Sequence, residues 1–201
     1  MIIAIVGPDG SGKTTQAEML TTRLNSQGTK AIYIRPVFLL MKKIFRREKS
    51  FQIASPRQKQ IEMMRRKTIH LFLKELIMLP LGYAYAFFSL AYIKLFLDRG
   101  RIIVCDRYFY QYFFDLCGAF ALTVSKFFPS PDMIFSLRAD FNNVRLRQSD
   151  SDRKIPEKYF FALLDFFDRL SKRKHFLQVD AALDKIFINN IIFDRVLKSK
   201  K

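Results

Sequence analysis

Short apolar runs alternate with longer stretches of helical periodicity along the whole chain. The runs are continuously apolar, which is typical of strands that are buried on both faces of a parallel sheet. We expect strands at Ile2–Val6, Ala31–Ile34, Ile102–Cys105, Met133–Leu137 and Phe176–Val179. The alternation of these runs with helical patterns predicts an α/β fold, in which helices flank a parallel sheet.

Three other segments have the spacing of amphipathic helices. The first begins after Lys13, places Ala17, Leu20 and Leu24 on one face, and ends near Gly28. The apolar faces expected for two later helices are Phe160, Phe161, Leu164, Phe167 and Leu170, with Pro156 in the first turn, and then Ile186, Ile191 and Val196. The chain has no internal repeat or low-complexity linker, so residues 1–201 are predicted to form a single domain.

An uninterrupted uncharged stretch, Leu76–Ile93, reaches the lower length limit for a membrane span. Pro80, Gly82 and several tyrosines dilute its hydrophobicity. A single crossing would also put the first strand and the strand Ile102–Cys105 on opposite sides of the bilayer, although both are expected in one sheet. A buried core helix is therefore the favoured interpretation, an interfacial helix comes second, and a true span comes last.

The net charge of +17 indicates which classes of partner the chain could bind. Ten basic residues against two acidic ones lie between Met41 and Lys67, and they carry about half of the excess charge. Such a field favours nucleotides, nucleic acid or an acidic membrane surface as partners, and a solvated basic face without a partner is an equal alternative.

Cys105 and Cys117 are too few for a disulfide framework. With no basic leader at the N-terminus, we expect a cytoplasmic protein, with peripheral attachment to a membrane left open.

The segment after the first strand satisfies the phosphate-binding loop pattern in full. Its glycines let backbone N–H groups point at phosphate oxygens, Lys13 reaches the β and γ phosphates, and the Thr14 hydroxyl is placed to ligate magnesium. The positive end of the following helix points at the same anion. The residues predicted to bind a nucleoside triphosphate are Gly7, Asp9, Gly10, Ser11, Gly12, Lys13, Thr14 and Thr15.

A second motif begins where the strand Ile102–Cys105 ends in Asp106 and Arg107. An Asp at this place holds magnesium, directly or through water, in P-loop enzymes. An acidic residue in place of Arg107 would indicate a base that activates water, whereas a guanidinium suits gripping a second, phosphorylated substrate. The motif therefore favours transfer to a bound acceptor over hydrolysis, and a purely structural Asp–Arg pair is the alternative.

Together, strand–GPDGSGKTT–helix and the later Asp106-Arg107-Tyr108 resemble the thymidylate kinase family, over nearly the whole chain. The resemblance implies a three-layer P-loop fold whose five parallel strands have the order 2-3-1-4-5. It also implies ATP and Mg²⁺ as cofactors, and transfer of the γ-phosphoryl group to a nucleoside monophosphate such as dTMP. Pro131–Leu137 is similar to the fourth strand of that family, and Gln178–Ala181 to the end of its last strand.

The resemblance also assigns roles to individual residues. Lys13 and Asp9 would take part in catalysis, and Arg35, Asp106, Arg107 and Tyr108 would line the acceptor site. Gly10 stands where some family members carry an arginine in the loop, so the catalytic arginine would come from a lid at about 141–156. The lid candidates, which lie in and beside a polar run, are Arg145, Arg147 and Arg153.

The acceptor-side region, about 36–98, and the helix that follows Asp106 depart from the family pattern. Arg35-Pro36 lacks the Glu of Arg-Glu-Pro, Tyr85 stands near a position that usually presents an Arg, and the aromatic run Phe109–Phe114 replaces polar residues. Two further hypotheses therefore stay open beside the nucleotide kinase. One is a divergent kinase that acts at an anionic membrane on a non-nucleotide phosphorylated acceptor, and the other is a nucleotide-dependent nucleic-acid-binding module, which no motif favours. A homodimer is also left open.

Overall fold

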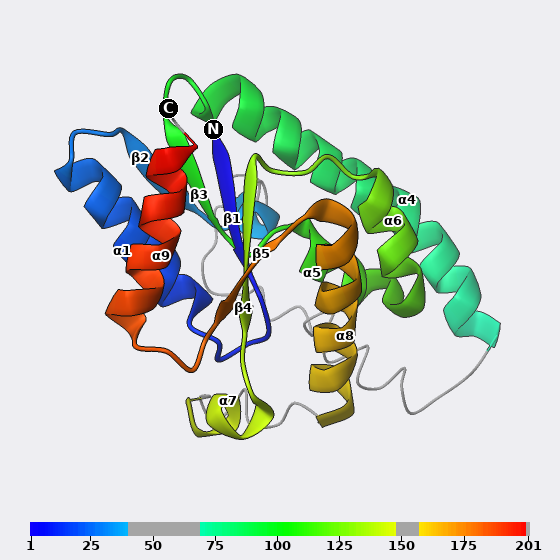
Figure 1. Ribbon diagram of the computed structural model, residues 1–201. Coiled ribbons are helices and arrows are strands. Elements are labelled where there is room, and N and C mark those ends of the chain that lie inside the picture. Colours follow the sequence, from blue (N-terminus) through cyan, green and yellow to red (C-terminus); the bar gives the residue numbers. More distant parts are fainter. Residues whose placement is uncertain (40–68, 148–156, 200–201) are drawn as a thin grey trace, which may run out of the picture.

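A five-stranded, all-parallel sheet forms the centre of the computed structural model, which describes residues 1–39, 69–147 and 157–199 (Figure 1). The strands are β1 (Ile2–Val6), β2 (Ala31–Ile34), β3 (Ile102–Asp106), β4 (Met133–Arg138) and β5 (Leu177–Asp180). Their order is β2-β3-β1-β4-β5, so the expected strand order is confirmed. The register pairs Ile5 of β1 with Asp106 of β3, which brings the end of β3 next to the start of the phosphate-binding loop.

Burial on both faces is confirmed for β1, β3 and the four central residues of β4, and is wrong for the two edge strands. Every residue of β1 and β3 is buried, whereas β2 and β5 each have two or more positions that are exposed or half-buried. The reason is that β1 and β3 have a neighbouring strand on each side, while β2 and β5 have one neighbour only.

The helices cover both faces of the sheet (Figure 1). Alternate residues of β1 enter two separate core clusters, because successive side chains of a strand point to opposite faces. Ile3 and Ile5 pack with residues of α1 and α9, and Ile2, Ala4 and Val6 pack in a cluster rich in residues of α4, α5 and α8. The elements outside the sheet are α1 (Lys13–Ser26), α4 (Ile69–Tyr92), a π-helix (Ile93–Leu97), α5 (Phe109–Cys117), a 3₁₀ turn (Gly118–Phe120), α6 (Ala121–Phe127), α7 (Phe141–Arg147), α8 (Glu157–Lys174) and α9 (Lys185–Lys198).

Helix α1 begins and ends as the sequence predicts. Gly28 adopts φ 75°, and its N–H donates to the Asn25 carbonyl at 3.0 Å, while the Thr29 N–H donates to the Leu24 carbonyl at 3.0 Å. This pair of bonds is a Schellman motif, which satisfies the last carbonyls of the helix and requires a left-handed residue. The glycine therefore ends α1 and turns the chain into β2.

The predicted apolar faces of α8 and α9 are partly wrong. Phe161 and Ile186 are 50% and 57% exposed, while the buried residues are Tyr159, Phe160, Leu163, Phe166, Phe167 and Leu170 in α8 and Ile188, Ile192, Phe193 and Val196 in α9. Long apolar runs such as Tyr159–Leu164 offer several faces of nearly equal hydrophobicity. Periodicity alone therefore does not determine which face turns inward.

Helix α4 is a core helix on one face only. Ala86 and Leu90 are buried in the core with Ile93 of the following π-helix, whereas Leu81 and Phe88 are exposed on the opposite side, as is Leu95 of the π-helix. The stretch Leu79–Leu97 is long and apolar enough to cross a membrane, and only 28% of it is buried. The expectation of a buried helix is thus half right, because the sheet and α5 cover one side of it.

Candidate active site

The phosphate-binding loop lies between β1 and α1, and its backbone depends on glycine. Gly7, Gly10 and Gly12 have φ values of 142°, 85° and 89°. A Cβ atom on Gly7 would lie 2.5 Å from the carbonyl oxygen of Leu137 in β4, so no larger residue fits there. Gly12 is the N-cap of α1 and gives that helix no side-chain cap. The first N–H groups of α1 are therefore available to an anion, as the sequence predicts.

The Lys13 side chain is buried, at 3% exposure, although it belongs to the phosphate-binding loop. Its ammonium donates to the Pro8 carbonyl at 2.6 Å and lies 3.5 Å from Asp9 Oδ1. Desolvation by burial lowers the pKa of Lys13 to about 8, although Asp9 opposes the shift. A triphosphate in the loop would supply the negative charge that the buried ammonium lacks.

Binding of a nucleoside triphosphate should therefore be accompanied by proton uptake at Lys13. With a pKa of about 8 in the free protein, Lys13 is half-protonated near pH 8, so binding should take up about half a proton there. Above that pH the affinity should fall by up to about tenfold per pH unit. Calorimetry in buffers of different ionisation enthalpy measures this uptake. At about pH 6 Lys13 is already charged and its uptake should vanish, and an unchanged proton balance near pH 8 would contradict the assignment.

Asp9 joins the loop to the end of β3. Its Oδ1 accepts a hydrogen bond of 2.6 Å from the Arg107 guanidinium, beside the contact with Lys13. Arg107 adopts φ 70°, a left-handed conformation that is strained for arginine, and its N–H donates to the Ile5 carbonyl at 2.9 Å. The strained turn directs Arg107 across the loop. The guanidinium thus pairs with Asp9, and the alternative of a structural pair between Arg107 and the neighbouring Asp106 is wrong.

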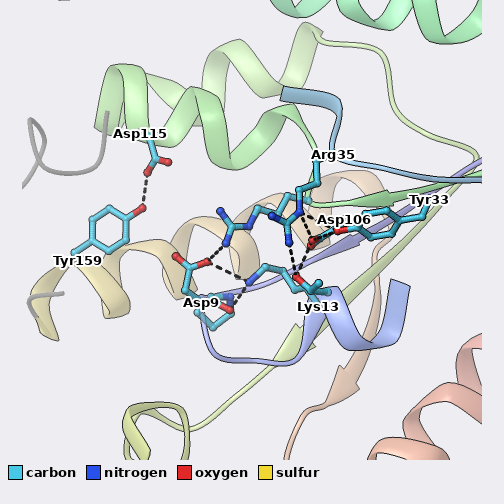
Figure 2. A network of polar contacts seen from close by, with 10 residues as sticks. Asp9, Lys13, Tyr33, Arg35, Asp106, Asp115 and Tyr159 are labelled. Atoms are coloured by element: carbon cyan, nitrogen blue, oxygen red, sulfur yellow. Dashed lines mark hydrogen bonds and ion pairs between the residues drawn. The ribbon is translucent and has the colours of Figure 1, made fainter. Parts of the chain in front are cut away.

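Asp106 ends β3 and accepts hydrogen bonds from a residue of α1, a residue of β2 and Arg35, which directly follows β2 (Figure 2). Its Oδ2 accepts from the Thr14 hydroxyl at 2.7 Å, the Tyr33 hydroxyl at 2.8 Å and Arg35 Nε at 2.9 Å. Sequence analysis missed Tyr33, a polar residue in the otherwise aliphatic strand β2, which pairs with β3. Desolvation and the bond to Asp106 raise the pKa of Tyr33, which keeps the phenol protonated as a donor.

Arg35 bridges the two residues that the sequence assigns to magnesium. Besides its bond to Asp106, the guanidinium donates to the Thr14 hydroxyl at 3.3 Å. Its side chain is 48% exposed, while that of Asp106 is fully buried. An exposed cationic side chain therefore covers the oxygen atoms at which a metal cation would bind.

The donor atoms fit Mg²⁺. Asp106 Oδ1 is buried and accepts no hydrogen bond from any described residue. No group of three or more His, Cys, Asp or Glu side chains within residues 1–39, 69–147 and 157–199 could hold a metal by itself. Mg²⁺ commonly binds one or two carboxylates plus substrate phosphates and keeps several waters. Asp106 and Thr14 would therefore be able to hold Mg²⁺ together with the phosphates of a bound triphosphate.

Comparison with known proteins agrees with this geometry. The family model of thymidylate kinase matches residues 5–192, which include every residue of the site. The chain belongs to the thymidylate kinase family. No curated protein sequence matches it.

Solved structures show the same fold at low sequence identity. Thymidylate kinase from Candida albicans is 19% identical with a TM-score of 0.66, over 99% of this chain and 92% of that one. Deoxyadenosine kinase from M. mycoides, with dCMP and dCDP as products, is 19% identical with a TM-score of 0.53 over all of both chains. The same enzyme with dCTP is 18% identical with a TM-score of 0.57, over 98% of this chain and all of that one. These likenesses support the thymidylate kinase fold.

Two tyrosines that sequence analysis places at or near the acceptor site make hydrogen bonds within the protein. The Tyr108 side chain is 0% exposed, and its hydroxyl donates to the Pro129 carbonyl at 3.0 Å. This side chain supports the start of α5 from inside the core. A contact between Tyr108 and an acceptor stays a prediction. Tyr85, near the position of the family arginine, donates to the Val37 carbonyl at 2.6 Å and links α4 to the segment after β2.

Besides Tyr33, sequence analysis missed a hydrogen-bonded pair that joins α8 to α5. The Tyr159 hydroxyl of α8 donates to the carboxylate of Asp115 in α5 (Figure 2). Asp115 is the single acidic residue of the aromatic helix α5, and that isolation is the signal that could have identified it. The pair fixes the beginning of α8, which follows the expected lid.

The lid itself stays a prediction. Arg145 and Arg147 lie on α7 at the end of β4, but their side chains lie outside the described part of the chain. Arg153 and the basic stretch between Met41 and Lys67 lie outside the described residues altogether. The remaining loop residues, Ser11 and Thr15, lie in the phosphate-binding loop and the first turn of α1 as expected, with Ser11 buried and Thr15 exposed.

Proposed function

We propose that this chain transfers the γ-phosphoryl group of ATP to a deoxynucleoside monophosphate, with dTMP as the first candidate. The observation that supports it most is the convergence of Thr14, Asp106 and Arg35 beside the loop. A donor site and an acceptor-side arginine thus meet at one carboxylate. Membership of the thymidylate kinase family supports the same reaction class.

In the proposed reaction an oxygen of the acceptor phosphate attacks the γ-phosphorus of ATP. The bond from that phosphorus to the β–γ bridging oxygen breaks, and ADP leaves with the electron pair. Backbone N–H groups of the loop and the Lys13 ammonium stabilise the charge on the phosphate oxygens. Thr14 and Asp106 would hold Mg²⁺, which would supply positive charge to the phosphate groups.

Arg35 and Arg107 are the proposed ligands of the acceptor phosphate. Both guanidinium groups are partly exposed, at 48% and 39%, while their carboxylate partners are buried. Each arginine can therefore turn toward a phosphate without moving the backbone. Guanidinium groups bind phosphate oxygens in a bidentate way, which orients the acceptor for in-line attack. Asp9 keeps Arg107 in place until the acceptor arrives.

A panel of acceptors tests the proposal. ADP formation from ATP is followed with dTMP, dUMP, dCMP, dAMP and dGMP, and also with a sugar phosphate and a lipid-linked phosphate. Product identity is confirmed by mass spectrometry. The panel includes dCMP because the structure of M. mycoides deoxyadenosine kinase contains it. We expect turnover with at least one deoxynucleoside monophosphate, and dTMP is expected to be among those used.

The control is Lys13→Ala purified in the same way, which excludes a contaminating kinase. ATP-dependent phosphorylation of a sugar phosphate or lipid-linked phosphate, with none of the nucleotides, would replace the nucleotide proposal by the membrane-surface kinase. If none of the nucleotide or non-nucleotide acceptors is phosphorylated, both versions are rejected. A cytoplasmic location is part of the proposal, since ATP and deoxynucleotides are found there.

A further inference from the structure

Tyr33 brings a hydroxyl group from the edge strand β2 into the candidate active site. The register of the sheet pairs Tyr33 with Val104, and Asp106 lies two residues further along β3. Since alternate residues of a strand point to the same face, Tyr33 lies on the face of the sheet that carries Val104 and Asp106. The ring packs against the core cluster that contains Val104, and the hydroxyl points at the carboxylate of Asp106 (Figure 2).

The Tyr33 hydroxyl is both a donor and an acceptor. It donates to Asp106 Oδ2 at 2.8 Å, and its oxygen accepts from Arg35 Nε at 2.8 Å. The same Nε–H group also donates to Asp106 Oδ2 at 2.9 Å, so two acceptors share one proton. A shared proton makes a less well aligned bond to each acceptor than a proton directed at one of them. Tyr33 therefore loosens the bond between Arg35 and Asp106 while it stabilises the carboxylate itself.

Asp106 needs these donors because its side chain is 0% exposed. A buried carboxylate that loses a hydrogen bond is destabilised by the desolvation of the unpaired oxygen. Oδ2 accepts from two neutral hydroxyl groups, those of Thr14 and Tyr33, and from the cationic side chain of Arg35. Among these three donor residues Arg35 is the exposed one, so it can leave without a change in the backbone.

Arg35 has two sets of partners that it cannot bind at the same time. In the structure its guanidinium donates to Asp106 at 2.9 Å and to the Thr14 hydroxyl at 3.3 Å. In the proposed reaction the same group binds the acceptor phosphate, and Asp106 and Thr14 hold Mg²⁺. Once Arg35 leaves, Thr14 and Tyr33 are the remaining donors to Asp106 Oδ2 among the described residues. The strand fixes Tyr33, whereas Thr14 also serves the metal.

We propose that Tyr33 is a positioning residue for phosphotransfer, whose hydroxyl holds Asp106 in place while Arg35 moves from Asp106 to the acceptor phosphate. The hydroxyl stabilises the carboxylate most in the state in which the guanidinium has left. Asp106 Oδ1, which is buried and accepts no hydrogen bond from a described residue, then stays available as a ligand of Mg²⁺. This inference rests on the proposed function, because it requires an acceptor phosphate at Arg35 and Mg²⁺ at Asp106 and Thr14.

A structural link between β2 and β3 is the alternative role for this hydroxyl. The two strands are already paired along Ala31–Ile34 and Ile102–Cys105, and phenylalanine in place of Tyr33 would keep the ring. A structural link would stabilise the protein to the same extent with or without Arg35. A positioning role depends on Arg35, and this dependence distinguishes the two.

Magnesium-dependent binding of a fluorescent, non-hydrolysable ATP analogue to the full chain tests the proposal without turnover. In Tyr33→Phe, Arg35 compensates for the lost donor before Mg²⁺ binds, because its Nε–H is then directed at Asp106 alone. After Mg²⁺ has bound, Arg35 has left and the hydroxyl is not replaced. The magnesium concentration for half-maximal binding should therefore rise about tenfold, the usual effect of one hydrogen bond to a charged group.

The decisive measurement is the same substitution in the Arg35→Met background. Here no guanidinium compensates for the lost hydroxyl, so Asp106 lacks it equally in the metal-free and the metal-bound state. Tyr33→Phe should then change the magnesium requirement by less than about twofold, and the difference between the two backgrounds measures the coupling of Tyr33 to Arg35. An equal rise in both backgrounds, or no rise in the presence of Arg35, overturns the proposal.

The matched control is Tyr110→Phe. The Tyr110 hydroxyl donates to Ser130 Oγ at 3.3 Å, before the start of β4 and therefore at the opposite edge of the sheet from the loop. This variant also loses one tyrosine hydroxyl and one donated hydrogen bond, and it should leave the magnesium requirement unchanged. If Tyr33→Phe lowers the melting temperature more than Tyr110→Phe does and leaves the magnesium requirement unchanged, the hydroxyl is a structural link and the proposal is wrong.

Steady-state kinetics give a second readout. In Tyr33→Phe the KM for dTMP should rise about tenfold, because Arg35 leaves Asp106 less readily, while kcat at saturating magnesium and dTMP stays nearly unchanged. Failure of the proposed function has a different signature. Nucleotide binding by the unsubstituted protein that does not respond to magnesium contradicts both the proposed function and the role of Tyr33. A protein that responds to magnesium and phosphorylates dTMP, with Tyr33→Phe behaving identically, contradicts the role of Tyr33 alone.

Discussion

Replacing Lys13 with alanine should lower kcat/KM for phosphotransfer by at least about 10²- to 10³-fold, the usual cost of losing one positioned donor to a developing charge. The ammonium is held at the loop by the Pro8 carbonyl and Asp9, 3% exposed, where electrostatic interactions are strong. Lys13 is the one lysine among residues 7–15, and the neighbouring Arg107 guanidinium is already paired with Asp9. Steady-state kinetics with saturating ATP measures the loss.

The fold should survive this substitution. Asp9 keeps its 2.6 Å bond to Arg107, and removing Lys13 also removes the cost of burying an ammonium. The expected change in melting temperature is therefore small, as it is for the control Lys172→Ala on the exposed surface of α8. Near-normal turnover of Lys13→Ala would show that the loop does not carry the reaction.

The second large effect should come from removing the negative charge of Asp106, the partner of Arg35. Asp106→Asn removes the negative charge to which Thr14, Tyr33 and Arg35 donate. The magnesium concentration for half-maximal activity should rise, and kcat should fall by about 10²-fold. The buried site keeps its shape because asparagine has nearly the same size as aspartate.

Arg35→Met should shift the magnesium requirement in the opposite direction. In the structure the guanidinium lies on both Thr14 and Asp106, so it competes with a metal cation for the same oxygen atoms. Its removal should lower the magnesium concentration needed, while KM for the acceptor should rise by about 10- to 100-fold through the loss of charged hydrogen bonds.

The opposite signs distinguish this arrangement from a general loss of stability. Binding of a fluorescent ATP analogue, titrated with magnesium, gives a readout that does not depend on turnover. Magnesium shifts in the same direction for Asp106→Asn and Arg35→Met would contradict competition between Arg35 and the metal. An unchanged acceptor KM in Arg35→Met would remove Arg35 from the acceptor site.

Local patterns in the sequence were sufficient for the sheet and the loop. Continuous apolar runs identified the five strands, and the glycine spacing identified Gly7 to Thr15, because a phosphate-binding turn depends on residues that are adjacent in the chain. Asp106 was also identified, since it directly follows an apolar run. The strand order came from the family resemblance and was confirmed.

The tertiary structure alone decided which charges meet and which surfaces stay exposed. Arg35 pairs with Asp106 and Arg107 with Asp9 because the order β2-β3-β1 brings the ends of three strands together. Tyr33 joins them for the same reason. The exposed side of α4 is equally a tertiary fact, because a helix that is apolar on every side gives no sign in its sequence of which side the sheet will cover. Sequence determines local conformation here, and contacts between distant segments determine the site.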